Sequence, residues 1–158
     1  MTPDQFHHIM SPVFEQVAGN SLVGALAREL NTAFPSDGET VKAIEAACHA
    51  AIDAGWMCAE GVAGRQFGRV IDPAPESHGL SVDVVCMKDF VGPHHIHPTG
   101  EIYLNMPMTP TAKFNGNGPG WCVFEPGSDH FPTVSDGEAL VLYMLPGGEI
   151  DFTGKSPD

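Results

Sequence analysis

The chain has 158 residues, of which 42% are hydrophobic and 17% charged, so it suits one globular domain with a proper core and is too short for two. Its formal net charge of −13, with only seven Lys and Arg residues, argues against nucleic acid and anionic membranes as partners. The N-terminus lacks a basic-then-apolar signal and no apolar run approaches membrane-spanning length, so we expect a soluble, cytoplasmic protein.

The first 55 residues predict three amphipathic helices, over residues 3–17, 21–34 and 38–54. In the second of these, Leu22, Leu26 and Leu30 recur at intervals of four, and Gly55 is a natural stop for the third. Such helices cannot bury their apolar stripes alone. We therefore expect residues 1–55 to pack on the rest of the chain or on the second subunit of a homodimer.

From Trp56 onward the pattern changes to short apolar runs separated by glycine and proline. We predict strands over residues 56–60, 66–71, 80–89, 94–97, 101–108, 121–124, 133–134 and 138–145, with a further short strand over 149–152. Residues 56–158 are thus expected to form a β-sandwich or barrel, and the whole chain a mainly β protein preceded by helices. Its four cysteines (Cys48, Cys58, Cys86 and Cys122) lie in apolar stretches without CxxC spacing, as reduced core residues do.

One segment, residues 92–105, has the pattern expected of a metal site and reads G-P-H-H-I-H-P-T-G-E-I-Y-L-N. Residues two apart in a strand share a face, so His95 and His97 point the same way and His94 the other. After a Pro-Thr-Gly turn, Glu101 begins a return strand beside the two imidazoles. Two histidines and a carboxylate on one face suit a divalent transition metal better than calcium or magnesium.

A second element, residues 120–134, ends a strand in a Pro-Gly turn and presents His130. The two segments together resemble the two motifs of the cupin superfamily: His95, His97 and Glu101 match the first, and Gly127 with His130 the second. The resemblance implies a jelly-roll β-barrel that holds one divalent metal through His95, His97, Glu101 and His130. Iron, manganese, nickel, cobalt, copper and zinc all accept such ligands.

Neighbouring residues are further candidates for the site. Tyr103 and Asn105 share the face of Glu101 and should line the barrel, where Tyr103 either packs or acts on a substrate. His94 is an outer-shell group, an alternative ligand or an ordinary polar residue.

If the strand that ends at Ile71 begins at Gly64, it places two cationic side chains together. Arg65, Phe67 and Arg69 lie on one face of it. The arginines either lie at the surface and contribute to solubility, or one of them enters the barrel and binds a substrate carboxylate through two parallel hydrogen bonds.

The chain resembles the 4-hydroxylaminobenzoate lyase family in three features. These are a helical N-terminal third, the segment H-H-I-H-P-x-G-E-I and a turn that reads P-G-S-x-H. This resemblance implies conversion of 4-hydroxylaminobenzoate and water to 3,4-dihydroxybenzoate and ammonia in bacterial nitroaromatic breakdown. A small aromatic carboxylate would then be the substrate, held by Arg65 or Arg69, with Phe67 or Trp121 packing its ring, Asn105 within reach and Glu101 shuttling protons. The alternatives are a non-haem iron dioxygenase acting on a thiol or an aromatic diol, and a ligand-binding cupin without turnover.

Overall fold

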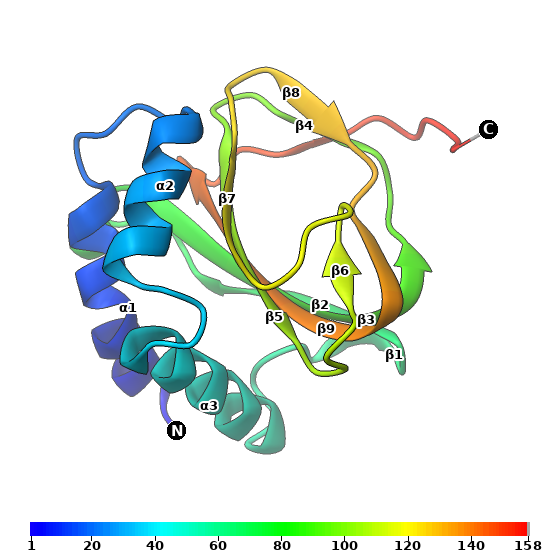
Figure 1. Cartoon of the computed structure of the whole chain (residues 1–158), viewed down its shortest axis with the longest axis horizontal. Coiled ribbons are helices and arrows are strands. Elements are labelled where there is room, and N and C mark those ends of the chain that lie inside the picture. The colour runs from blue at the N-terminus through cyan, green and yellow to red at the C-terminus, as the bar shows by residue number, and fades with distance from the viewer. Residues whose placement is uncertain (158) are drawn as a thin grey trace.

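A computed structural model describes residues 1–157 and shows three helices on one side of a β-barrel (Figure 1). Helices α1 (Pro3–Val17), α2 (Gly24–Ala33) and α3 (Glu39–Asp53) lie within a few residues of the predicted ranges. Helix α1 begins at a capping box, in which the Thr2 hydroxyl accepts from the Gln5 amide and the Gln5 side chain accepts from Thr2. Within residues 1–157, no helix is both long enough and apolar enough to cross a membrane.

The strands form two antiparallel sheets that face each other. The large sheet has the order β1-β2-β3-β9-β5-β7, with β6 also paired to β9, and the small sheet has the order β10-β4-β8. The bounds are β1 Glu60–Val62, β2 Arg65–Ile71, β3 Leu80–Val91, β4 His95–His97, β5 Glu101–Pro107, β6 Lys113–Phe114, β7 Gly120–Phe124, β8 Ser128–His130, β9 Thr133–Pro146 and β10 Asp151–Phe152, and a 3-10 turn spans Pro75–Ser77. The prediction of a mainly β chain with an N-terminal helical segment is confirmed.

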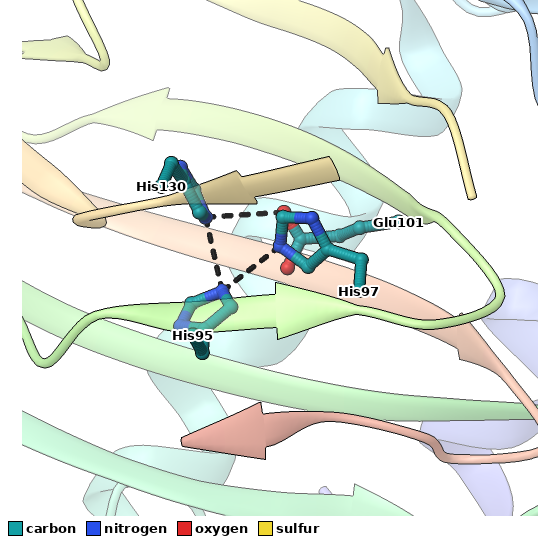
Figure 2. Close-up of side chains that lie close together, drawn as sticks. All are labelled: His95, His97, Glu101 and His130. Carbon is teal, nitrogen blue, oxygen red and sulfur yellow. Dashed lines mark hydrogen bonds and ion pairs between the residues drawn. The ribbon is translucent and has the colours of Figure 1, made fainter. Parts of the chain in front are cut away.

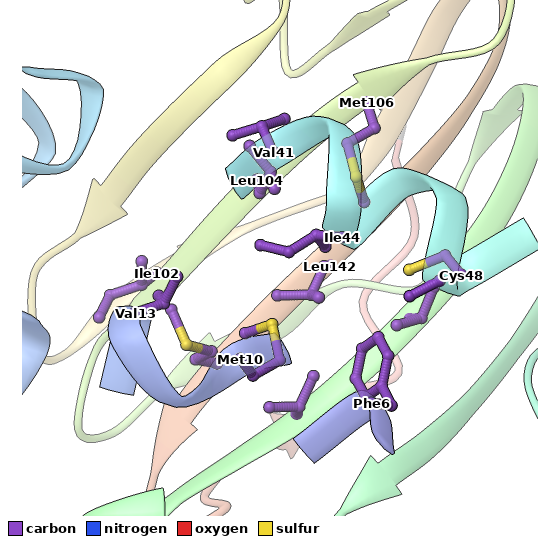
Figure 3. Packing of buried hydrophobic residues seen from close by; sticks show 14 of the residues in the cluster. Phe6, Met10, Val13, Val41, Ile44, Cys48, Ile102, Leu104, Met106 and Leu142 are labelled. Carbon is purple, nitrogen blue, oxygen red and sulfur yellow. The ribbon is translucent and has the colours of Figure 1, made fainter. Parts of the chain in front are cut away.

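Alternation along the strands gives the large sheet two different faces. On β5, Ile102 and Leu104 point outward into a core that they share with the helices. Figure 3 shows this core, where Met10 of α1 and Ile44 of α3 pack near Leu142 of β9. The apolar stripes of the helices are therefore buried against the sheet of their own chain.

Helix α2 covers the edge of the large sheet. Asn31 on α2 bonds the backbone of Trp121 in both directions, with its Nδ2 donating to the carbonyl (2.9 Å) and its Oδ1 accepting from the amide (3.0 Å). These bonds satisfy backbone groups that an edge strand such as β7 otherwise leaves open.

Three strand predictions were wrong or incomplete. Residues 56–59 form turns, because Met57 and Cys58 fold into the core beneath the sheet and Cys58 adopts a positive φ of 51°. The separate strands predicted over 133–134 and 138–145 are one strand, β9, interrupted where Asp136 and Gly137 have positive φ. Strands β6 and β8 were not predicted, since two and three residues carry no readable alternation.

Candidate metal centre

Three histidines and one glutamate converge between the two sheets. His95 and His97 come from β4 and His130 from β8 of the small sheet, while Glu101 opens β5 of the large sheet. The register places His95 directly opposite His130, so their side chains share a face. One ligand atom from each of the four residues lies within 4.8 Å of the others, and all four side chains point to one spot (Figure 2).

Three of the four short separations between these atoms are close to those of ligands on a common ion, and the fourth is a few tenths of an ångström longer. His95 Nε2 lies 2.9 Å from His97 Nε2 and 3.0 Å from His130 Nε2. Glu101 Oε2 lies 3.4 Å from His97 Nε2 and 3.8 Å from His130 Nε2. Ligands about 2.1 Å from one metal lie roughly 3.0–3.4 Å from each other when they subtend octahedral or tetrahedral angles.

Hydrogen bonds at the other ring nitrogens orient the two β4 imidazoles. His95 Nδ1 donates to the carbonyl of Pro93 (3.3 Å), which leaves Nε2 with a free lone pair. His97 Nδ1 lies 3.0 Å from the hydroxyl oxygen of Ser128. Such outer contacts fix the ring orientation in histidine metal sites.

Asn115 orients the third imidazole from outside the two motifs. Its Nδ2 lies 2.7 Å from His130 Nδ1, while its Oδ1 accepts from the backbone amide of Thr133 (3.1 Å). Asn115 has a positive φ of 49°, a conformation that asparagine tolerates better than most residues. Sequence reasoning missed Asn115, for which an Asn-Gly turn was the only available signal.

Burial favours the neutral form of the three imidazoles and disfavours the ionised form of the Glu101 carboxyl group. Desolvation lowers the pKa of His95, that of His97 to about 4 and that of His130 to about 3. Desolvation, aided by the charge of Asp83, raises the pKa of Glu101 to about 8. Neutral imidazole is the form that binds metals, so three of the four groups are ready as ligands at neutral pH.

Glu101 provides the test of whether these residues fit a metal. Its carboxyl group is 2% exposed and its Oε2 has no hydrogen-bond partner among the described residues. A buried, unpaired carboxylate is costly unless a cation compensates it, and no arginine or lysine pairs with it in residues 1–157. The N₃O donor set therefore fits a divalent transition metal.

A cavity of about 270 Å³ adjoins the cluster, and both His95 and Glu101 line it. Its other walls are mainly apolar and include Phe90, Phe114, Tyr143 and Phe152. The barrel is thus not filled by its own side chains, and the space suits one small ring-sized ligand. A larger hollow of about 560 Å³ beside residues 110–113 contains none of the four clustered residues.

The two arginines have different surroundings, although both lie on the barrel-facing side of β2. Arg65 lines the cavity beside Phe67, and its guanidinium carbon lies 5.5 Å from the centre of the Phe90 ring. No carboxylate lies within 4.0 Å of Arg65 among residues 1–157. Arg69 instead pairs with Asp83 (3.3 Å) and donates to the Gly148 carbonyl (3.1 Å), and it does not line the cavity.

Three other predicted site residues lie away from the cavity. Tyr103 and Asn105 point into the barrel but are sealed by neighbours: Asn117 Nδ2 donates to the Tyr103 hydroxyl (3.0 Å), and Asn105 Nδ2 donates to the Gly118 carbonyl (3.1 Å). Trp121 needs correction, because its ring packs on the outer, helix-facing side and its Nε1 donates to the Phe34 carbonyl (2.9 Å). Alternation along β7 turns Trp121 away from the barrel interior.

His94 takes no part in the cluster. As alternation along β4 predicts, its ring points away from His95 and His97, and both its nitrogens are engaged by Thr153 and Asp129. Sequence reasoning also missed the cavity residue Tyr143, whose pKa is raised by burial so that the hydroxyl stays protonated. Its inward position on a long strand was the available signal.

An antiparallel barrel of two sheets that gathers His95, His97, Glu101 and His130 inside is a cupin with a candidate metal centre. A family model described as PnbB, 4-hydroxylaminobenzoate lyase, matches residues 8–152. The chain therefore belongs to the 4-hydroxylaminobenzoate lyase family, and the resemblance inferred from the two motifs is confirmed.

Two relatives that carry this name agree with the assignment. The chain is similar to a 4-hydroxylaminobenzoate lyase of Pseudomonas putida, at 28% identity over 80% of this chain and 82% of that protein. It is also similar to one from Nocardioides sp. (strain LMS-CY), at 26% identity over 99% of this chain and 98% of that protein. Among solved structures, the polyketide cyclase RemF from Streptomyces resistomycificus aligns with a TM-score of 0.43 and 17% identity over 62% of this chain and 77% of that chain.

Proposed function

We propose that this lyase is metal-dependent and converts 4-hydroxylaminobenzoate and water to 3,4-dihydroxybenzoate and ammonia. The observation that carries the proposal is the cavity itself, which joins the His-Glu cluster to one unpaired arginine across apolar walls. A planar ring with a carboxylate at one end and a polar group at the other matches this order of surfaces. The names of the relatives support the same substrate.

Arg65 holds the substrate carboxylate in this scheme, and Arg69 does not. The Arg65 guanidinium has no acidic partner among the described residues, so its paired N–H groups are available for a two-pronged contact. In a chain with a net charge of −13, one local cation is needed to offset repulsion of an anionic substrate. The rings of Phe90 and Phe114 then flank the substrate ring.

The reaction is redox-neutral, since the N–O bond supplies the oxidising equivalents. A divalent metal, when bound, supplies Lewis-acid activation of the hydroxylamino oxygen. Cleavage of the N–O bond releases that oxygen as water and leaves the ring electron-deficient. One water adds to the ring carbon ortho to the nitrogen-bearing carbon and loses a proton. A second water hydrolyses the resulting imine to ammonia, and a proton shift from the hydroxylated carbon to the new carbonyl oxygen restores the aromatic ring, so one water is consumed overall.

Glu101 is the group placed to move protons during these steps. It lines the cavity, and a weak bond to the metal would leave its carboxyl group free to take up and release a proton. The departing oxygen needs a proton, and the attacking water must lose one. The apolar walls keep bulk water from competing with the ordered one.

Metal analysis followed by an anaerobic assay tests the proposal. The purified protein should contain close to one transition metal per chain and release ammonia from 4-hydroxylaminobenzoate without oxygen. A dioxygenase cannot turn over under those conditions, and a binding protein releases no product. Metal-loaded protein that binds the compound without forming 3,4-dihydroxybenzoate overturns the proposal.

The two arginines provide a matched pair of variants for the substrate contact. Arg65→Ala should raise KM for the carboxylated substrate by about 10- to 100-fold, as expected on losing a charged hydrogen-bond pair. Arg69→Ala should change KM less and lower stability instead, because it leaves Asp83 buried without a partner. Equal kinetics in wild type and Arg65→Ala removes Arg65 from the binding site.

A further inference from the structure

The C-terminal strand β10 forms part of the cavity wall. It pairs antiparallel with β4, with Asp151 opposite Ile96 and Phe152 opposite His95, and the Thr153 amide donates to the His94 carbonyl (3.2 Å). The Phe152 ring lies edge-on to His95 at 5.6 Å between centres and lines the cavity. In Figure 1 the end of the chain runs beside β4, on the side away from the helices.

This strand is too short to be held by its ladder alone. Its paired residues are only Asp151 and Phe152, and the Phe152 side chain is 62% exposed, so burial does little to fix it. Two-stranded pairs of this length are marginal in water. A further attachment is needed to keep the Phe152 ring beside His95.

His94 supplies that attachment through both of its ring nitrogens. Nε2 lies 2.7 Å from Asp129 Oδ2, and since a carboxylate only accepts, Nε2 carries the proton and donates. Nδ1 then accepts from the Thr153 hydroxyl at 2.6 Å, and the same hydroxyl accepts from the Lys155 amide (3.2 Å). The His94 ring is 5% exposed and packs against Phe131 at 4.7 Å, so its position is fixed.

We propose that residues 151–153 form a strap that supplies one wall of the substrate site, and that His94 and Thr153 position it. Phe152 on the strap determines specificity by offering an aromatic edge to a planar ring next to the cluster. His94 is thus a positioning residue. The substrate part of this inference rests on the proposed function, whereas the attachment of the strap does not.

Thr153 is the residue through which the strap can be tested without touching the cluster. Thr153→Val keeps the shape of the side chain and removes the hydroxyl, whereas Thr153→Ser keeps the hydroxyl. Hydrogen exchange of the amides at 151–153 should become about tenfold faster in Thr153→Val and stay as in wild type in Thr153→Ser. Thr32→Val on helix α2, which loses only a bond to the Arg28 carbonyl, serves as a control for the substitution itself.

Kinetics then test the role of Phe152. With 4-hydroxylaminobenzoate, Thr153→Val and Phe152→Ala should each raise KM about three- to tenfold with kcat changed less than about twofold, and Phe152→Tyr should restore KM. Metal content should stay at the wild-type level in all of these variants. Unchanged exchange in Thr153→Val overturns the attachment, and an unchanged KM in Phe152→Ala overturns the wall.

The two proposals fail in different ways. If wild-type protein does not turn over 4-hydroxylaminobenzoate, the proposed function is overturned, and the exchange rates alone then decide whether His94 and Thr153 hold the strap. If wild type turns over but Thr153→Val matches it in both exchange and KM, the strap is overturned and the proposed function stands.

Discussion

The two faces of the large sheet have different surroundings and different tasks. The outer face contributes Ile102, Leu104 and Leu142 to a continuous apolar core with the three helices. The inner face carries Glu101, with an unpaired buried oxygen, and adjoins a partly empty cavity. The outer face therefore mainly stabilises the fold, whereas the inner face combines a smaller apolar cluster, which includes Tyr103 and Val141, with the reactive site.

This difference implies that stability and activity can be damaged separately. Substitutions of apolar residues on the outer face should lower the free energy of unfolding and leave the metal site intact. Substitutions of the four clustered residues inside should abolish metal binding or catalysis and leave the stability of the metal-free protein nearly unchanged. The predictions below test that separation.

Removal of one imidazole from the cluster should have the largest effect. His97→Ala should lower metal affinity by more than about a hundredfold and abolish turnover, because one of the four convergent donors is lost. The melting temperature of the metal-free variant should differ little from that of the metal-free wild type, because the loss of a buried polar group offsets part of the cost of the cavity that the missing ring leaves. Elemental analysis and calorimetry measure both, with His49→Ala on α3 as the control histidine variant.

A cavity in the outer core should have the opposite result. Leu142→Ala removes a fully buried side chain between the sheet and the helices and should cost about 2–5 kcal/mol in the free energy of unfolding. Denaturant titration measures this loss, and metal stoichiometry in the native state should not change. Loss of metal from folded Leu142→Ala would show that the two faces are coupled.

Loss of a hydrogen bond that orients a ligand should lower metal affinity without abolishing metal binding. Ser128→Ala removes the hydroxyl 3.0 Å from His97 Nδ1 and should lower metal affinity by about 10- to 100-fold. Competition with a chelator of known affinity gives the value. Ser128→Thr, which retains a hydroxyl, should keep most of the affinity, and equal affinities for Ser128→Ala and wild type contradict the role of this contact.

Acid should destabilise the metal-free protein because the unfolded chain protonates His97 and His130 more readily than the folded one does. The pKa values of His97 and His130 are about 4 and about 3 in the folded state, below the ordinary 6.5, so the unfolded chain takes up protons first as pH falls. Below pH 6.5 each of these two histidines lowers the free energy of unfolding by up to about 1.4 kcal/mol per pH unit, until the folded pKa values are reached. Glu101, whose pKa is raised from 4.5 to about 8 in the folded state, has the opposite effect between those two values. The net fall from pH 6.5 to 5 should therefore be about 1 kcal/mol per pH unit, and stability should also fall as pH rises toward 8. Urea titrations from pH 7 to 5 measure this slope, which should be shallower in His97→Gln.

Much of the fold could be predicted because its signals are local. The helices and the longer strands have clear periodicity, and strand alternation alone separated His95 and His97 from His94. Trp121 was misplaced because its strand was recognised but its direction relative to the barrel was not. Alternation shows that a strand has two faces, but it does not show which face lies inside the barrel. That is decided only when the helices pack on one side of the sheet.

The remaining features depend on contacts between distant segments. Asn115 reaches His130 from a turn beside a two-residue strand, and Phe152 joins the cavity through a strand formed only by pairing with β4. Neither pairing has a periodic signal in the sequence. The choice between Arg65 and Arg69 likewise required Asp83, which lies opposite Arg69 on the neighbouring strand.

The alternation along β5 has a consequence for how this family can change over time. Glu101 faces the cluster while Ile102 and Leu104 face the helices, so inserting or deleting a single residue in this strand exchanges the two sets. Such a change places aliphatic side chains at the reactive site and polar ones in the core at once. Relatives can therefore differ at many β5 positions but should preserve the strand's length, and insertions should accumulate in turns that do not contact the cluster.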